Sequence, residues 1–234
     1  MTPITRERLG ASSGLISAVL FGISFVISLG LDPDPVPELA GSADTIQQYV
    51  VDNADSLRVV FLLNTLAMLF FLWFLGSVRA SLRSEEGGAG RVSGIASGGG
   101  IVGAAFVILA QIFGATATLR ADEPTVITDP EITRTLVDLQ AMSIGLGAAA
   151  FAVFFFAVAV AVFYDGGLPS PLGILACIAG IAAAAGLVTL FTVSGVFAAD
   201  DAFGFWVRYA AFVVWVAVAS VLLVINVRAP RGRR

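Results

Sequence analysis

The sequence predicts an all-helical (all-α) polytopic membrane protein, a six-transmembrane-helix bundle with a short amphipathic helix on the outer face. Of the 234 residues, 58% are hydrophobic and only 13% are charged. Six stretches of 19 to 34 residues contain no charged residue, namely 9–31, 59–78, 92–119, 139–164, 166–199 and 209–227. A bilayer core of about 30 Å needs about 20 helical residues, so each stretch is long enough to cross it. We therefore expect residues 1–234 to form one membrane domain.

The first span is predicted at 11–30. It should end at the following segment, because Pro33, Pro35 and Pro37 cannot continue a helix. A cleaved secretory signal is the alternative interpretation of this stretch, but its apolar part is long for a signal core.

The segment 42–53 predicts a short amphipathic helix on the outer interface. Ser42 is a good N-cap residue, and Ile46, Tyr49 and Val50 would share one face of the helix. A solvated loop is the alternative.

The second span is predicted at 57–78. Four aromatic residues gather towards its inner end, Phe70, Phe71, Trp73 and Phe74. This pattern is typical of an interfacial belt or of lipid contact.

The third span is predicted at 93–119 and is rich in glycine. Gly94 and Gly98, and likewise Gly99 and Gly103, form pairs of small residues four positions apart. Such pairs indicate close approach to a neighbouring helix.

The fourth span is predicted at 136–164, but its helix should begin earlier. The run Asp129-Pro130-Glu131 has an N-cap residue, a first-turn proline and an acid at the positive end of the helix dipole. The resulting helix is longer than a bilayer needs, so it should project from the membrane or bend near Gly145 and Gly147.

The fifth span is predicted at 171–197, where Ser170 and Pro171 mark the start of a helix rich in alanine and glycine. The single cysteine, Cys177, lies in it and is expected to be a small core residue. The sixth span is predicted at 205–227.

The arginines predict the orientation, with both termini cytoplasmic in the plasma membrane. Nine would lie inside, namely Arg6, Arg8, Arg79, Arg83, Arg91, Arg228, Arg231, Arg233 and Arg234, and four outside, namely Arg58, Arg120, Arg134 and Arg208. This asymmetry follows the positive-inside rule.

The composition excludes several kinds of chemistry. The chain has no lysine and no histidine, so it can form no Schiff base and offers no imidazole to haem or zinc. We expect no cofactor and no metal. The net charge of −4 argues against nucleic acid as a partner. The lipid bilayer is the expected partner, with a protein partner or a homo-oligomer left open.

Five polar residues lie at similar depth in the outer halves of the predicted spans. They are Ser24, Asn64, Gln111, Ser143 and Thr192, each five to nine positions inside the nearest outer charged residue. Polar side chains inside a bilayer are costly, so a shared depth is informative. They are our candidates for ligand binding in an outward-facing polar pocket. A layer of hydrogen bonds between helices is the alternative.

Charged residues at the outer ends of three spans are a second candidate group. They are Arg58, Arg134, Asp138 and Arg208, with Asp55, Asp200 and Asp201 close to them in sequence. They could form a vestibule that attracts an anion. The alternative is a rim of arginines that snorkel and pair with neighbours for little net stability.

Serines recur along one face of the first span, at Ser13, Ser17, Ser24 and Ser28. Packing against another helix is one explanation of this small, polar face, and lining of a cavity is the other.

The stretch SADTIQQYVVDNADSLRVVFLLNTLAMLFFLWFLGSVRASLR at 42–83 resembles a loosely defined class of small actinobacterial membrane proteins with six predicted spans. In that class an outer amphipathic segment leads into an aromatic second helix. The resemblance implies the same layout here, and it implies no activity and no catalytic residues.

Three functions remain compatible with the sequence. The first is a non-catalytic membrane protein that binds or supports a partner. The second is a small permease or lipophile-binding protein that uses the outer polar pocket. The third is a carboxylate-dependent membrane enzyme built around Asp52, Asp55 and Asp138.

Overall fold

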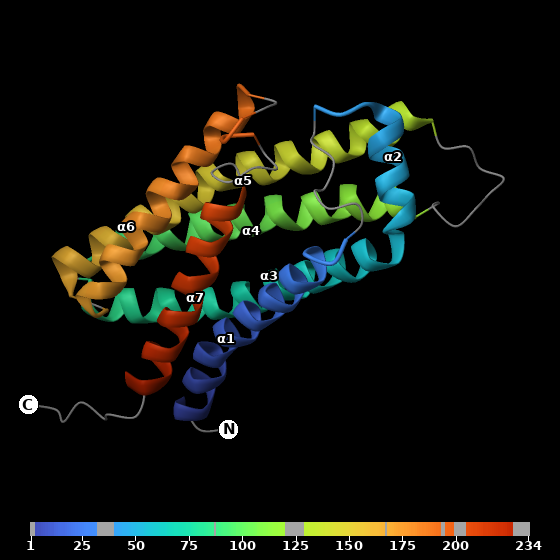
Figure 1. Ribbon diagram of the computed structural model, residues 1–234. Coiled ribbons are helices and arrows are strands. Elements are labelled where there is room, and N and C mark those ends of the chain that lie inside the picture. The colour runs from blue at the N-terminus through green and yellow to red at the C-terminus, as the bar shows by residue number, and fades with distance from the viewer. Residues whose placement is uncertain are drawn as a thin grey trace, which may run out of the picture.

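The computed structural model describes residues 3–31, 40–86, 88–119, 129–166, 168–192, 195–198 and 205–226. Within them the chain forms helices and no strand (Figure 1). The elements are α1 (Pro3–Ser28), α2 (Ala43–Asp52), α3 (Ala54–Glu85), α4 (Arg91–Thr118), α5 (Pro130–Asp165), α6 (Ser170–Ala185), the 3-10 helix η1 (Gly186–Leu190) and α7 (Val207–Asn226). Six helices in these ranges are long and apolar enough to span a membrane, α6 and η1 counting as one. The predicted fold class is confirmed.

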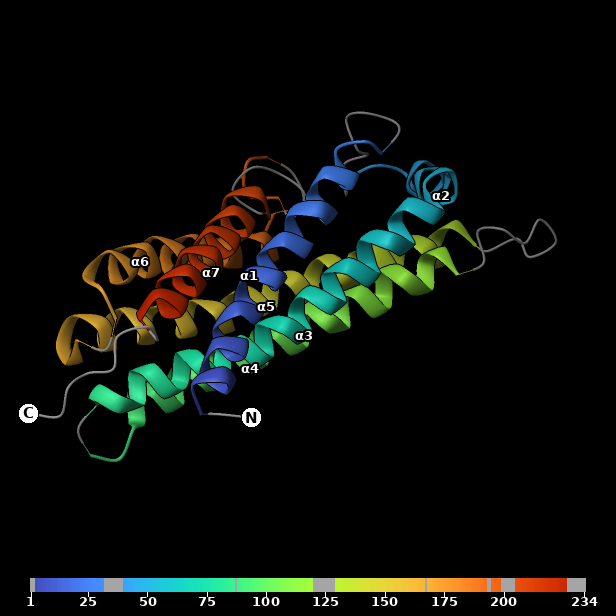
Figure 2. The ribbon, with the colours of Figure 1, turned by 90° about the horizontal axis from the view of Figure 1, so that it is seen from below.

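The six long helices form a closed ring in which each helix packs on two neighbours. The order around the ring is α1, α3, α4, α5, α6, α7 and back to α1. Figures 1 and 2 show the start of α1 and the end of α7 at the end of the bundle away from α2. We call the two ends the α2 end and the terminal end.

Aromatic side chains fill the middle of the ring. We call this group the aromatic core, and its members are Phe71, Phe151, Phe154, Phe155, Phe212 and Trp215. Neighbouring ring centroids in it lie 4.9–6.2 Å apart, mostly edge to face or tilted. Aromatic pairs prefer these arrangements because of the ring quadrupole. The core therefore ties α3, α5 and α7 together across the ring.

The aromatic residues of the second span divide between this interior and the outer surface. Phe71 and Phe74 are fully buried, whereas Trp73 is 64% exposed on the outside of the bundle. The prediction of lipid or belt contact is thus wrong for Phe71 and Phe74. With 3.6 residues per turn, positions 71 and 74 share a face that position 73 does not.

Glycines allow α4 and α5 to lie close together. Of the two predicted glycine pairs, only one lies at this contact. A Cβ atom on Gly99 would lie 2.7 Å from the backbone of α5, and one on Gly103 would lie 2.9 Å from the ring of Phe151. Gly94 and Gly98 have no such neighbour within 4 Å. Close helix approach is therefore the role of Gly99 and Gly103 within this chain.

The fifth span is shorter than predicted and changes its winding. α6 ends at Ala185, and η1 continues to Leu190, so helical structure stops before the predicted end at 197. A 3-10 helix rises about 2.0 Å per residue against about 1.5 Å in an α-helix. The two segments together therefore extend about 34 Å, which is enough to cross a bilayer core of about 30 Å.

The predicted short helix exists and packs on the long α5. The Ser42 hydroxyl caps α2 by accepting the backbone N–H of Thr45 at 3.2 Å. α5 runs for 36 residues as a single helix, and α2 packs mainly on it. Arg134 near the start of α5 donates from Nη1 to the carbonyl of Gly41 at 3.0 Å.

Glu86 joins α3 to α4 at the terminal end. Its carboxylate accepts the backbone N–H of Val92 at 2.7 Å and that of Ser93 at 3.1 Å. These N–H groups belong to the first turn of α4 and have no partner within the helix. Burial by itself raises the pKa of Glu86, but hydrogen bonds from Ser93 and Val92 and the charge of Arg83 lower the pKa below its usual value.

We expect Glu86→Gln to lower the thermal unfolding temperature at neutral pH. Because the folded-state pKa of Glu86 is lowered, its stabilisation is fully present above the unfolded-state pKa and is lost as the pH falls through the folded value. The wild type and the variant should therefore converge in acid. Melting curves in detergent from about pH 7 to about pH 3 test this, since the pKa values of unperturbed carboxyl groups lie near 4. The exposed Glu7 gives the control variant Glu7→Gln. A difference in unfolding temperature between the wild type and Glu86→Gln that does not depend on pH would contradict capping of α4 by the Glu86 carboxylate.

Candidate functional site

A cavity of about 550 Å³ lies inside the ring towards the α2 end. Its wall takes residues from all six long helices, α6 contributing Ala183, and α2 adds Ile46, Tyr49 and Val50. Phe151 and Phe155 of the aromatic core also line it. Small-molecule sites commonly have volumes of about 300–1,000 Å³ and mostly apolar walls with a few polar groups. This cavity has both properties.

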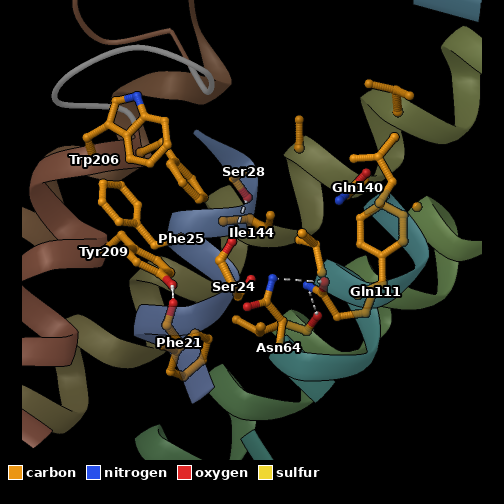
Figure 3. Close-up of a pocket in the computed structure, with 18 of the residues that line it drawn as sticks. Phe21, Ser24, Phe25, Ser28, Asn64, Gln111, Gln140, Ile144, Trp206 and Tyr209 are labelled. Carbon is orange, nitrogen blue, oxygen red and sulfur yellow. Dashed lines mark hydrogen bonds between the residues drawn. The ribbon is translucent and has the colours of Figure 1, made fainter. Parts of the chain in front are cut away.

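One side of the cavity is aromatic (Figure 3). Phe25 of α1 meets Trp206 edge to face with ring centroids 5.4 Å apart, and Phe21 meets Tyr209 in the same way at 5.6 Å. The Tyr209 hydroxyl donates to the backbone carbonyl of Phe21 at 2.6 Å. This hydrogen bond fixes the rings of α7 against α1.

The opposite side carries amide side chains, as Figure 3 shows for Asn64, Gln111 and Gln140. Asn64 donates from Nδ2 to Gln111 Oε1 at 3.4 Å, and Gln111 donates from Nε2 to the carbonyl of Val107 at 3.1 Å. Asn64 Oδ1 is buried and has no hydrogen-bond partner within the described ranges. The wall of the cavity thus contains a hydrogen-bond acceptor, Asn64 Oδ1, that has no described donor.

Arg208 is the charged residue of the cavity wall in the described part of the chain. Its side chain is only 9% exposed, and Nη1 and Nη2 are buried without a hydrogen-bond partner among the residues that the structure describes. A Cβ atom on Gly186 would lie 2.7 Å from Nη1. The missing side chain at Gly186, where α6 gives way to η1, therefore makes room for the guanidinium group.

Tyr49 lines the cavity from α2, which is not one of the spanning helices. Burial raises the pKa of Tyr49 to about 12. The hydroxyl group is neutral at physiological pH, as in any unperturbed tyrosine, and it can both donate and accept a hydrogen bond.

Three of the five candidate ligand-binding residues lie in the cavity wall, namely Ser24, Asn64 and Gln111. The other two, Ser143 and Thr192, do not line it. The Ser143 hydroxyl donates to the carbonyl of Leu139 at 2.7 Å, and the Thr192 hydroxyl lies 3.4 Å from the carbonyl of Val188. A role in ligand binding stays a prediction for all five.

The position of Ser143 is explained by rotation about the helix axis. The cavity face of α5 contains Val137, Gln140, Ala141, Ile144 and Ala148, which follow a helical repeat. At 3.6 residues per turn, Ser143 lies about a third of a turn away from the middle of that face. Gln140, only two positions after Asp138, is nearer the outer end than the five candidates but lies on the cavity face, and this repeat is the signal that would have identified it.

The predicted charges at the outer rim have different environments. Arg58 pairs with Asp55 at 3.0 Å, and its Nη2 donates to the carbonyl of Thr118 at 2.5 Å. Arg134 bonds to the backbone next to α2, as described above, while Asp138 is half-buried. Of the four charged candidates, only Arg208 lines the cavity. Asp200 and Asp201, which neighbour it in sequence, lie outside the described residues.

The serines of α1 serve two purposes along its length. The Ser17 hydroxyl donates to the carbonyl of Ala67 in α3 at 2.8 Å. Ser220 of α7 likewise donates to a backbone carbonyl of α1. Nearer the α2 end, Ser24 and Ser28 line the cavity, and Ser28 donates to the Ser24 carbonyl at 3.0 Å. Both explanations of the serine face therefore apply, each to one half of the helix.

The carboxylates considered for an enzyme site do not line the cavity. Asp52 accepts a hydrogen bond from Gln48 at 2.7 Å, and Asp55 pairs with Arg58. Across the described ranges, no group of three or more His, Cys, Asp or Glu residues is placed to hold a metal ion.

Comparison with protein-family models, with curated proteins and with solved structures finds no match to this chain.

Proposed function

We propose that this membrane protein binds a small lipophilic or amphiphilic molecule in the cavity at its α2 end, without catalysing a reaction on it. The observation that carries the proposal is a cavity of about 550 Å³ inside six membrane-length helices, with a mainly apolar and aromatic wall. A molecule dissolved in the bilayer can exchange one apolar environment for another when it enters such a cavity.

The polar part of the wall favours an amphiphile over a plain hydrocarbon. Leaving a buried acceptor such as Asn64 Oδ1 without a partner costs about 1–3 kcal/mol. A ligand hydroxyl or amine would donate to this oxygen, while an apolar chain would contact the rings of Phe21, Phe25 and Trp206. The arrangement thus offers separate surfaces for the two parts of an amphiphile.

We further propose that the α2 end faces the outside of the plasma membrane, with both termini in the cytoplasm. Support comes from the nine arginines assigned to the inner loops and tails against four on the other side. The ligand would then enter from the outer leaflet or from the extracellular space.

Fluorescence of Trp206 provides a test of the proposed function. A bromine-substituted fatty alcohol quenches an indole that it touches, and Trp206 lines the cavity. The surface residue Trp73, which is 64% exposed, should be replaced by phenylalanine so that lipid contact does not dominate the signal. We expect saturable quenching of the Trp73→Phe protein in nanodiscs.

Two variants that replace an alanine by phenylalanine separate binding in the cavity from partitioning into lipid. Ala141 lines the cavity, whereas Ala105 is exposed on the outside of α4. Ala141→Phe should weaken the saturable quenching, because overpacking of about 1–3 kcal/mol corresponds to a loss of affinity of about 5- to 150-fold. Ala105→Phe should bind as the parent does. Equal quenching of both variants would remove the proposal.

A further inference from the structure

We infer that Arg208 is the binding point for an anionic headgroup, so that the ligand is an amphiphile with a carboxylate or phosphate on an apolar chain. This inference rests on the proposed function and adds the charge of the ligand to it. It starts from one observation, a guanidinium group in the cavity wall whose Nη1 and Nη2 atoms have no partner among the described residues.

The environment of Arg208 makes an unpaired charge costly. The side chain is more than nine-tenths buried inside a bundle of apolar helices. Arginine cannot lose its proton under physiological conditions, so the charge must be compensated and cannot be removed. Buried arginines in membrane proteins are therefore paired with another group or mark a functional site.

The described part of the protein does not supply that compensation. Arg208 lies beside Gly186, where α6 gives way to η1. No described carbonyl or carboxylate accepts a hydrogen bond from Nη1 or Nη2. The fork of donors that fits a carboxylate or a phosphate is thus left unused.

The rest of the wall determines what kind of anion fits. Next to Arg208, the cavity is lined by Trp206, Phe212 and other apolar residues, and no other described charged side chain faces it. Inorganic ions would leave this apolar surface bare, whereas an acyl or alkyl chain would cover it. Because the arginine side chain is long and rotatable, the guanidinium group can turn from Gly186 to a headgroup in the cavity.

The experiment compares brominated probes with the same chain and different headgroups. They are a fatty acid, the corresponding fatty alcohol and the corresponding trimethylammonium compound, used with the Trp73→Phe protein in nanodiscs at about pH 9, where a carboxylic acid is ionised. Quenching of Trp206 gives the affinity. We expect the acid to bind about ten- to hundredfold more tightly than the alcohol, as a charge-assisted hydrogen bond allows. The cation should bind most weakly.

Substitutions at Arg208 test whether this preference depends on its charge. Arg208→Gln should make the acid and the alcohol bind equally, and Arg208→Lys should restore part of the preference because it restores the charge. Equal binding of acid and alcohol by the wild type would overturn the headgroup assignment and leave the proposed function standing. Absence of binding by either probe would instead reject the proposed function.

Two further outcomes would overturn the inference. Displacement of the fatty acid by inorganic phosphate at millimolar concentration would show that the apolar chain is not needed. A large decrease in the unfolding temperature of the ligand-free Arg208→Met variant would show that the guanidinium already has a structural partner. We expect that temperature to stay the same or rise, because a buried unpaired charge has been removed.

Discussion

Gly99→Ala is expected to lower the unfolding temperature of the bundle, whereas Gly98→Ala should leave it unchanged or raise it slightly through its gain in helix propensity. A Cβ atom on Gly99 would lie 2.7 Å from the carbonyl oxygen of Ala150 and equally close to the backbone nitrogen of Phe154. Backbone atoms cannot turn aside as a flexible side chain can, so α4 and α5 must move apart. Overpacking of this kind costs about 1–3 kcal/mol, and occasionally more.

The neighbouring glycine is the control, because a Cβ atom on Gly98 meets nothing within 4 Å. Both substitutions gain helix propensity equally, so the difference between them isolates the contact with α5. Heating in detergent followed by size-exclusion chromatography measures the folded fraction. Similar unfolding temperatures for Gly98→Ala and Gly99→Ala would contradict the close approach of the two helices.

Trp215→Ala is expected to destabilise the protein by about 3–5 kcal/mol, the usual effect of removing a large buried aromatic side chain. The indole is fully buried in the aromatic core, 5.3 Å from the ring of Phe154 and 5.4 Å from that of Phe155. Its Nε1 donates to the carbonyl of Leu172 in α6 at 3.2 Å. The substitution therefore opens a cavity between three helices and leaves an acceptor without its donor.

Trp73→Ala serves as the matched control, since its indole is 64% exposed on the outside of α3. We expect it to change the unfolding temperature little. Trp215→Phe should fall between the two, because it keeps most of the packing and loses the hydrogen bond. Equal effects of Trp73→Ala and Trp215→Ala would mean that the aromatic core does not hold the ring together.

The layout of this fold is readable from sequence because it depends on local signals. A run without charges predicts a spanning helix, and Ser42 predicts the start of α2 through one hydrogen bond to a residue three positions away. The sequence does not show whether Phe71 and Trp73 face the interior or the lipid. Both are apolar, and only the neighbouring helices decide which face of α3 turns inward.

The sequence predicts how deep in the membrane each candidate residue lies, but it does not predict which way the side chain faces around the helix axis. Depth follows from a rise of about 1.5 Å per residue, and it brought Ser24, Asn64 and Gln111 to the same level of the bundle. Rotation about the axis depends on tertiary packing. This is why Ser143 lies off the cavity face of α5 while Gln140 lies on it.

The burial of Arg208 could not be read from the sequence because it depends on another helix. The residue stands at the start of the last span, close to the acidic pair at 200–201, which suggests an exposed rim. The structure instead places its guanidinium group against Gly186, where α6 gives way to η1. A glycine in a span rich in alanine and glycine gives no sign of this role.

The aromatic core also bears on the direction in which a guest molecule can travel. The cavity ends at Phe151, Phe155 and Phe212, whose rings are interlocked with those of the neighbouring helices. A solute that arrives from the α2 end meets a closed floor, and α3, α5 and α7 would have to separate before it could pass. For the ligand proposed above, this arrangement favours a site that holds or senses the molecule over a path that conducts it through the bundle.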